Sequence, residues 1–575
     1  MRLITKDDIQ YLTNKKENCE PNERPLAIEG AGHVFIFYDT ETSGLDKDFS
    51  QILQIALVFT DDNLNILSSK KIECRRSPWV VPSPGALLTT GFTPEDLKKS
   101  KNSHYEMMQE VDEWIRSQYM PVIFSGYNTL GYDEPVLAQN FHQNLLEPGL
   151  TTLRSPATGE TNGRSDIMVL VKAVAMYMPA ALKLDTQNDF GSASLSLLNV
   201  AQQNGVSLGN HDAHDAMNDI RATIGVAKVI RKAAPQIWDQ MTQLATVAGV
   251  DDFMAKNKIF THSYMAYGKA KSAVVTNITT RDGDATEILF DLSTDPAKYM
   301  NMSVAELADC MAPQNAKYHP FRHAPKDGQP VLMPMDMSDR VIPAKFDDKI
   351  AEQRADMLKA DPDFAKRVSA AAAKVRAAAV KPIQPHVPET LMDVPMSDPT
   401  RAKVDQWLRE FNNTTSWKDA AKLVIDFPQR FEEELKSEPH IRRFAKFAGR
   451  IVFEAEPEAL DNTKQELMRR HIAGRILNPD LTAPYMTIAK ARKELEQIEH
   501  ERGAGRARWK DVTDTQIRSL KLYYTSIEKE YAPYATAKPS GPQGGNKPPA
   551  NDDGYMPSQG GASPRRSIAN DRFKP

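Results

Sequence analysis

A short apolar run that ends in two acidic residues constrains this chain most. Residues 33–38 read HVFIFY, and Asp39 and Glu41 follow with one residue between them. Such a run is typical of a buried strand, and side chains two positions apart on a strand face the same way. The two carboxylates would repel each other unless a cation lay between them, and divalent metal ions prefer oxygen ligands. The pattern therefore favours a metal site, although a lone Asp-x-Glu at a strand end is also typical of a solvated loop.

A third carboxylate, Asp133, follows a second strand-like segment. Residues 122–124 are expected to form a short buried strand, which Gly126 and Asn128 end in a turn. Asp133 then opens a helical stretch over residues 134–144. Its carboxylate is interpreted either as a metal ligand or as the N-cap of that helix.

The fourth carboxylate lies in the segment HDAHDAMND, residues 211–219. A helix is expected to follow, with Asp215 as its cap, Asp219 on its second turn and His214 in the loop before it. An unperturbed imidazole titrates near pH 6.5, so His214 can accept a proton from water, although it can also be a surface or capping histidine. The remaining side chains of the segment are interpreted as loop or cap residues: His211, Asp212 and Asp215.

Together these side chains predict a site for two divalent cations. The four acids carry a formal charge of −4, which two such ions would neutralise, and the predicted ligands are Asp39, Glu41, Asp133 and Asp219. A pair of metal ions can clamp an in-line displacement at phosphorus. His214 would then accept the proton of the attacking water. The sequence contains no glycine-rich phosphate loop that would compete for this role.

The three motifs resemble those of the DEDDh 3′–5′ exonucleases: Asp39-Thr-Glu41, Tyr132-Asp133, and His214 separated by four residues from Asp219. Further stretches resemble the exodeoxyribonuclease I family of bacteria, densely over residues 33–232 and more weakly beyond. They are residues 82–95 (PSPGALLTTGFTPE), 126–128 (GYN), 204–206 (NGV) and 214–219.

The resemblance implies an α/β fold with an RNase H-like exonuclease domain and a mixed sheet. It further implies two Mg²⁺ ions, which Mn²⁺ can replace, and 3′–5′ degradation of single-stranded DNA to 5′-mononucleotides in DNA repair and recombination. The substrate-binding residues it implies are Glu41, Thr42 and Asn128. The implied partners are single-stranded DNA and the C-terminal tail of a single-stranded-DNA-binding protein, with the enzyme itself a monomer.

The chain divides into five segments by composition and periodicity. We expect a polar leader at residues 1–32, the exonuclease domain at 33–235, a small β-containing domain at 245–335, a helical domain at 340–535 and a disordered tail rich in Pro, Gly, Ser and Asn at 536–575. The resemblance implies an SH3-like fold for the small β domain. A stretch of spaced prolines between residues 382 and 399 is expected to be an extended linker.

The bulk composition is that of a globular protein without a global basic field. The net charge is −4 over 575 residues, so an affinity for nucleic acid would depend on local patches. Three scattered cysteines, Cys19, Cys74 and Cys310, favour a reducing compartment. The charged N-terminus is unlike a signal peptide, and no run approaches the length of a membrane span. We therefore expect a cytoplasmic protein.

Two basic clusters in the helical region interleave cations with aromatic residues, a combination that single-strand binders use. The first comprises Arg442, Arg443, Lys446 and Arg450 with Phe444 and Phe447, and the second comprises Arg502, Arg506, Arg508 and Lys510 with Trp509. Phenylalanines at helical spacing are also typical of a core, so both interpretations stay open.

Two other functions are compatible with the motifs. One is another DEDDh nuclease, either a polymerase-proofreading subunit or an RNA-trimming exoribonuclease; the long chain after Asp219 argues against it, because those enzymes are usually much shorter. The other is a DNA-binding scaffold with a dead site, which the presence of all four carboxylates and His214 disfavours.

Overall fold

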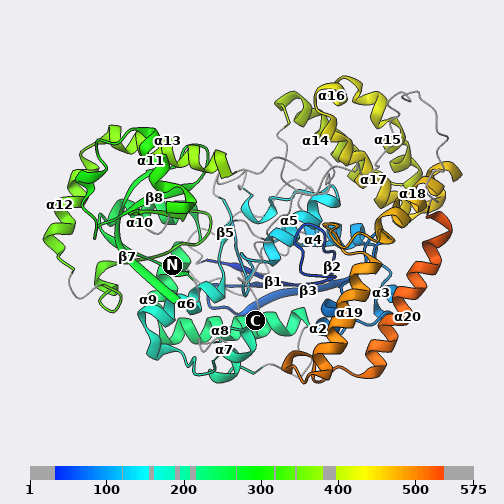
Figure 1. Ribbon diagram of the computed structural model, residues 1–575, viewed down its shortest axis with the longest axis horizontal. Coiled ribbons are helices and arrows are strands. Elements are labelled where there is room, and N and C mark those ends of the chain that lie inside the picture. Colours follow the sequence, from blue (N-terminus) through cyan, green and yellow to red (C-terminus); the bar gives the residue numbers. More distant parts are fainter. Residues whose placement is uncertain are drawn as a thin grey trace.

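The computed structural model places two β-sheets and a large set of helices around them (Figure 1). It describes residues 33–118, 121–153, 161–187, 194–207, 215–266, 269–315, 319–342, 346–379 and 396–535. The predicted leader, most of the proline-rich linker, the tail and the segment 208–214 with His214 lie outside the described residues.

The first sheet is mixed and carries the acidic run on its central strand. Its strands are β1 (Phe35–Thr42), β2 (Ile52–Thr60), β3 (Ile66–Glu73), β4 (Ile123–Ser125) and β5 (Gly163–Arg164), in the order β3-β2-β1-β4-β5. Strands β1, β2 and β3 are antiparallel neighbours, whereas β4 runs parallel to β1 and β5 parallel to β4. The predicted mixed sheet is confirmed, and β1 extends past Tyr38 through both acidic residues.

Helices cover both faces of this sheet because alternate residues of β1 are apolar on both sides. Phe35 and Phe37 pack with α6, α8 and α9, whereas Ile36 and Tyr38 pack with α4 and α5. The helices of this part of the chain are α2 (Pro84–Thr90), α3 (Asp96–Lys99), α4 (His104–Arg116), α5 (Asp133–Gln143), α6 (Ile167–Tyr177), α7 (Leu197–Gln203), α8 (Ala216–Ala233), α9 (Pro235–Gln243) and α10 (Val247–Lys256).

The second sheet is antiparallel and lies beside the first (Figure 1). Its strands are β6 (Phe260–Ala266), β7 (Lys269–Thr280), β8 (Thr286–Asp291), β9 (Phe321–Pro325) and β10 (Val331–Pro334), in the order β10-β6-β7-β8-β9. A hairpin across residues 281–285 joins β7 to β8. The short connection 326–330 joins β9 and β10, which lie at opposite edges of this sheet.

The two sheets share one hydrophobic core. Phe35 and Phe37 of β1 belong to the same buried cluster as Phe260, Val275 and Leu332 of the second sheet. The far face of the second sheet is covered by α11 (Val304–Met311), α12 (Asp348–Lys359) and α13 (Pro362–Ala379). The β-containing segment is therefore packed against the first sheet.

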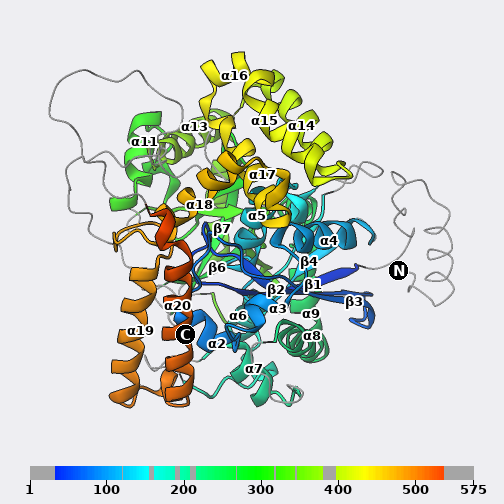
Figure 2. The same cartoon turned by 90° about the vertical axis from the view of Figure 1, so that its right-hand side faces the viewer.

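The C-terminal part is helical and packs directly on the first α/β part (Figures 1 and 2). Leu53, Trp79, Leu87 and Tyr105 share a core with residues of this helical part, so neither part buries its apolar surface alone. Its helices are α14 (Asp398–Asn412), α15 (Trp417–Arg430), α16 (Glu432–Ser437), α17 (Arg442–Ala455), α18 (Asn462–Ile476), α19 (Ile488–Gly503) and α20 (Asp514–Tyr531).

Polar contacts reinforce that junction near the end of β1. The carboxylate of Glu494 on α19 accepts hydrogen bonds from Ser83 Oγ (2.7 Å) and from Gly85 N (3.1 Å). Ser83 N in turn donates to the carbonyl of Ser43, two residues after Glu41 (2.8 Å). Ser83 thus connects Glu494 of the helical part to the backbone of Ser43, close to the acidic end of β1.

Gly126 ends β4 at a point where a side chain has no room. A Cβ there would lie 2.7 Å from the carbonyl oxygen of Tyr38 and 2.1 Å from Thr129 Cγ2. We expect Gly126→Ala to lower the free energy of unfolding by about 1–3 kcal/mol, because the strand and the turn must move apart.

Gly474, an exposed residue of α18 with nothing within 4 Å of its Cβ position, provides the control. Gly474→Ala should raise stability by about 1 kcal/mol, as expected for an exposed helical position. Chemical denaturation of both variants measures the difference. Equal effects of the two substitutions would contradict the close packing at Gly126.

Candidate metal centre and substrate-side loop

Strand β1 carries Asp39 and Glu41 on one face. Both residues lie in the part of β1 that is not paired with β4. Strand β4 pairs only with residues 35–37 of β1, so the edge of β1 beyond Phe37 is open. On its other edge β1 stays paired with β2, with Asp39 opposite Ala56 and Glu41 opposite Gln54. Glu41 is buried and Asp39 is half-buried. The sheet therefore holds both carboxylates rigidly in a partly dry environment.

Helix α8 brings the third carboxylate to this strand end. Oxygen atoms of Asp39, Glu41 and Asp219 all lie within 4.8 Å of one another. The predicted cap is confirmed, because Asp215 accepts hydrogen bonds from the backbone N–H groups of Met217 and Asn218. Asp219 consequently lies at the end of the first helical turn, not on the second.

The start of α8 is also tied to the sheet. Lys71 Nζ on β3 lies 2.6 Å from Asp215 Oδ2, and Gln54 Oε1 on β2 accepts a hydrogen bond from Ala216 N (3.0 Å). Since Gln54 is the register partner of Glu41, one pair of strands orients both the acidic strand end and the helix that delivers Asp219.

Asp133 occupies the open edge of β1. Its Oδ1 atom accepts hydrogen bonds from Thr40 N (3.1 Å) and Thr40 Oγ1 (2.6 Å). Tyr132, not Asp133, occupies the N-cap position of α5, so the interpretation of Asp133 as a cap is wrong. Thr40, which separates Asp39 from Glu41, thus holds Asp133 against this end of β1, although Asp133 is not one of the three residues whose oxygens lie within 4.8 Å of one another.

The raised pKa values of these acids favour the binding of a cation. Burial, and then the neighbouring Asp133, Glu41 and Asp219, raise the pKa of Asp39 well above its usual range. Burial and the charges of Asp219 and Asp133 raise the pKa of Glu41 to about 9. Burial raises the pKa of Asp133 to about 7, although its hydrogen bonds with Thr40 act in the opposite direction. Several oxygen ligands that cannot easily be ionised together fit divalent cations.

The turn after β1 is shaped by internal hydrogen bonds. Thr42 Oγ1 bonds to the carbonyl of Gly44 (2.7 Å) and pairs with Tyr132 Oη (2.7 Å), and Tyr132 Oη also donates to the Gly44 carbonyl (2.6 Å). Thr42, predicted to bind substrate, is buried. Tyr132 and Thr40 have structural roles that the motifs alone did not assign, although both lie inside them.

Asn128, the other predicted substrate residue, lies at the tip of the loop between β4 and α5. Its backbone is left-handed, with φ of 63°, and its side chain is half-buried. His214 lies outside the described residues, and the described chain resumes at Asp215. The roles of His214, Thr42 and Asn128 therefore stay predictions.

The aromatic residues of both basic clusters belong to the protein core. Phe444, Phe447 and Trp509 are all buried in the core of the helical part, so the interpretation of these rings as base-stacking platforms is wrong. Arg443 and Arg450 are buried as well, with Arg450 stacked on Trp79 (5.4 Å). The helical spacing of Phe444 and Phe447 therefore reflects a helix face that packs in the core.

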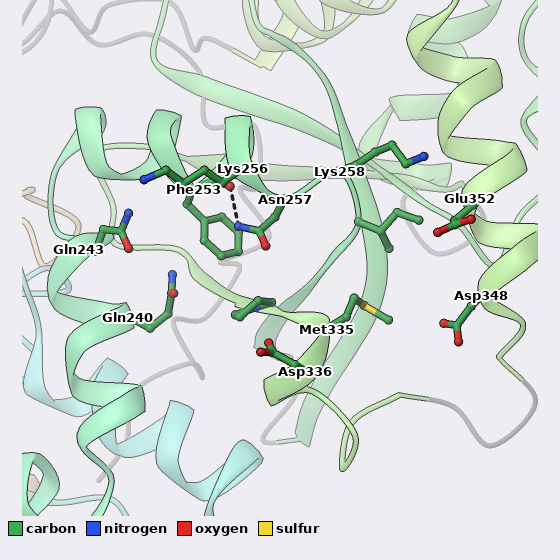
Figure 3. A pocket seen from close by; sticks show the side chains of 12 residues that line it. Gln240, Gln243, Phe253, Lys256, Asn257, Lys258, Met335, Asp336, Asp348 and Glu352 are labelled. Atoms are coloured by element: carbon green, nitrogen blue, oxygen red, sulfur yellow. Dashed lines mark hydrogen bonds between the residues drawn. The ribbon is translucent and has the colours of Figure 1, made fainter.

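A hollow of about 820 Å³ lies elsewhere, between α9, α10, β10 and α12 (Figure 3). Its lining residues include Lys256 and Lys258 as well as Asp336, Asp348 and Glu352. None of the four predicted metal ligands is among its lining residues. The acidic cluster, not this hollow, is the place where the chemistry of the side chains converges.

Comparison with known proteins identifies the first part of the chain. Residues 36–227 match the family model described as Exonuclease (RNase_T). This part of the chain is an exonuclease domain. Exonucleases of this family depend on divalent metal ions, and the match contains all the predicted metal ligands of this exonuclease domain.

The relatives that align with the exonuclease domain are bacterial exodeoxyribonucleases I. The protein of Buchnera aphidicola from Schizaphis graminum is 30% identical over 206 residues, which are 36% of this chain and 41% of the relative. That of Escherichia coli K12 is 26% identical over 209 residues, 36% of this chain and 42% of the relative. The aligned region thus spans about two fifths of the length of these curated relatives. The predicted resemblance to exonuclease I is confirmed.

Solved structures extend the likeness beyond the exonuclease domain. Exonuclease I from Methylocaldum szegediense superposes with a TM-score of 0.65 at 20% identity, covering 86% of this chain and all of that chain. E. coli exonuclease I in complex with a dA16 oligonucleotide superposes with a TM-score of 0.63 at 18% identity, covering 87% of this chain and 100% of that chain. The fold of this chain is therefore similar to that of these two exonucleases I beyond the exonuclease domain.

The helices of the described part include none that is both long enough and apolar enough to cross a membrane.

The raised pKa values predict how stability depends on pH and on metal. The folded metal-free protein keeps a proton on Glu41 between its ordinary value of 4.5 and about 9, whereas the unfolded chain releases it. The stability of the metal-free protein should therefore fall as pH rises through this window. Millimolar Mg²⁺ should raise the melting temperature more at pH 8.5 than at pH 5.5, which differential scanning fluorimetry measures.

Asp39→Asn tests the same cluster without an activity assay. Removing one of the crowded charges should stabilise the metal-free protein at pH 8 by roughly 1–3 kcal/mol, since each unit of raised pKa corresponds to about 1.4 kcal/mol. It should also abolish most of the shift produced by Mg²⁺. Asp239→Asn, at an exposed position on α9, is the control and should change neither. A Mg²⁺ shift that survives Asp39→Asn would contradict the cluster as the metal site.

Proposed function

We propose that this chain is a 3′–5′ exodeoxyribonuclease that hydrolyses single-stranded DNA to 5′-mononucleotides with two Mg²⁺ ions. The observation that carries the proposal is the convergence of Asp39, Glu41 and Asp219 oxygens within 4.8 Å, at a partly buried strand end. The match of residues 36–227 to the exonuclease family supports it, as does the fold shared with exonuclease I.

The residues of the chain have distinct parts in the proposed reaction. Asp39, Glu41, Asp133 and Asp219 would hold the divalent ions, which when bound would polarise the scissile phosphate and activate the attacking water. Thr40 keeps Asp133 in place, and the pairing of β1 with β2 keeps Asp39 and Glu41 on one face. His214 would accept the proton from the attacking water, and an imidazole is suited to this role near neutral pH.

Complexes of solved relatives with oligonucleotides support the proposed substrate class. E. coli exonuclease I has been solved with dA16 and dT13 oligonucleotides, so the related fold accommodates single strands. We propose that Glu41, Thr42 and Asn128 contact the 3′-terminal nucleotides. The proposed organisation is an exonuclease domain at 33–235, an SH3-like domain at 245–335 and an exonuclease I-type helical domain at 340–535.

The setting of the enzyme is also part of the proposal. It would act in the cytoplasm as a monomer, in DNA repair and recombination, and the C-terminal tail of a single-stranded-DNA-binding protein would bind to its helical domain. The second interpretation, another DEDDh nuclease that proofreads or trims RNA, differs in the substrate it prefers.

A labelled-substrate assay tests the activity and separates these interpretations. With 5′-labelled single-stranded DNA, duplex DNA and RNA of one sequence, single-stranded DNA should be shortened from its 3′ end in Mg²⁺ and left intact with chelator. Asp39→Asn should lower the rate by at least about 10³-fold, because the charge of a metal ligand is lost, and should leave DNA binding largely intact. Asp239→Asn should cut at the wild-type rate. Preference for RNA would favour the alternative, and wild-type activity of Asp39→Asn would contradict the metal role.

His214→Ala should separate proton transfer from metal binding. Losing a general base typically costs about 10²–10⁴-fold in rate. The shift of melting temperature with Mg²⁺ should stay at the wild-type value, because the carboxylates remain. Single-turnover rates measure the first effect and scanning fluorimetry the second. An unchanged rate would remove His214 from the mechanism, and a lost Mg²⁺ shift would make it part of the metal site.

A further inference from the structure

The connection between β9 and β10 inserts one side chain into the exonuclease domain. Gln329 lies in this connection, in the left-handed region with φ of 47°, and only 2% of its surface is exposed. A residue other than glycine in that conformation is uncommon and is kept only where surrounding contacts determine it. The contacts of Gln329 hold its backbone in this left-handed conformation.

The three hydrogen bonds of the Gln329 side chain go to the first α/β part of the chain. Its Oε1 atom accepts from the backbone N–H of Asp166 (2.8 Å). Its Nε2 atom donates to Ser165 Oγ (2.8 Å) and to the carbonyl of Met241 on α9 (3.1 Å). The amide thus uses both of its ends, and no other side chain type of that length provides an acceptor and two donors.

The same connection is anchored on either side of Gln329. Arg164 Nη1 donates to the carbonyl of Asp327 (2.6 Å), and Lys326 Nζ lies 2.8 Å from Asp251 Oδ1 on α10. The turn is closed by Gly328 N, which donates to the carbonyl of Pro325 (3.1 Å). Gln329 is therefore presented from a fixed turn.

Asp166 passes this support on to the loop of Asn128. Its buried carboxylate accepts hydrogen bonds from Asn128 N (2.8 Å) and Leu130 N (3.3 Å), as well as from Met168 N in the first turn of α6 (2.9 Å). The backbone beside it is also fixed, because Ile167 N donates to the carbonyl of Gly126 (2.8 Å). One carboxylate thereby joins the loop 126–132 to the start of α6.

We propose that Gln329 is a positioning residue for single-stranded DNA, which orients Asp166 and through it the loop that presents Asn128. The inference rests on the proposed function and goes beyond it, because it assigns the small β-containing segment a part in substrate binding. The β-containing segment would affect the substrate only through Asp166 and the loop 126–132, without contacting the nucleotide itself.

The arrangement predicts an effect on DNA binding that is separate from metal binding. Asp133, at the end of the same loop, is held independently by two hydrogen bonds from Thr40. Loss of the Gln329 contacts should therefore displace Asn128 more than Asp133. A residue needed only for general stability would weaken both kinds of binding together.

Gln329→Met tests the proposal in the full-length protein, because methionine keeps the length of the side chain and removes its hydrogen bonds. The dissociation constant for a labelled dT oligonucleotide, measured by fluorescence anisotropy with chelator, should rise about three- to tenfold, as for one or two lost hydrogen bonds. The single-turnover cleavage rate at saturating DNA should stay within about twofold, and so should the Mg²⁺ concentration that gives half of that rate.

Tyr177→Phe is the matched control at the same junction. Tyr177 Oη pairs with Thr261 Oγ1 (2.8 Å) and Ser263 Oγ (2.6 Å) of β6, at the other end of α6 from Asp166. This variant loses buried hydrogen bonds between the same two parts of the chain and should bind DNA as the wild type does. Equal weakening by both variants would reduce Gln329 to a stability residue and overturn the proposal.

A double-mutant cycle with Asn128→Ala decides whether the effect passes through the loop. If it does, the combined variant should bind DNA no more weakly than Asn128→Ala alone, whereas independent sites would multiply their effects. Should Gln329→Met fail to fold, Asp166→Asn replaces it, because the amide keeps the shape but opposes its own N–H group to Leu130 N. Unchanged DNA affinity of a folded variant overturns the inference while the wild type still degrades DNA, whereas an inactive wild type would instead refute the proposed function.

Discussion

The mutual repulsion of the carboxylates at the end of β1 is the constraint around which the rest of the structure is arranged. Burial and neighbouring charge raise the pKa values of Asp39, Glu41 and Asp133 together, so the metal-free cluster destabilises the fold near neutral pH. Proteins keep such a cluster where the strain serves a function. Divalent cations relieve the repulsion, and a pair of such cations can also stabilise the attacking and leaving oxygens of phosphodiester hydrolysis.

The surrounding elements hold the acids against that repulsion. Pairing of β1 with β2 fixes Asp39 and Glu41, the capped and salt-bridged start of α8 fixes the approach of Asp219, and Thr40 holds Asp133. Contacts from distant parts support this framework. Glu494 of the helical part binds the segment beside Ser43, and Gln329 of the second sheet supports the loop of Asn128 through Asp166. The exonuclease domain is thus braced from both sides by the segments that follow it.

Local patterns predicted the parts of this fold that local chemistry determines. The apolar run before Asp39 and the cap at Asp215 both appear where the sequence placed them. Each depends on residues within a few positions, so a short window contains the cause. The predicted carboxylates of Asp39, Glu41 and Asp219 also meet, since three motifs in a fixed order constrain which strand ends and helix starts converge.

Long-range partners could not be predicted in this way. Gln329 and Asp166 are 163 residues apart in the sequence, and neither forms part of a motif. The burial of Phe444 and Phe447 was equally undetermined, because an apolar helical stripe looks the same whether it faces a core or a strand of DNA. In both cases the role of the residue depends on which distant element packs against it, and local patterns in a single sequence do not show this.

Diffraction from crystals of the protein grown with Mn²⁺, recorded at a wavelength where manganese scatters anomalously, tests the central claim most directly. The account predicts an anomalous peak about 2.0–2.6 Å from carboxylate oxygens of Asp39, Glu41 and Asp219, the usual range for oxygen ligands of such cations. The peak should disappear in crystals of the Asp39→Asn protein. Well-ordered carboxylates that approach one another with no peak between them would contradict it.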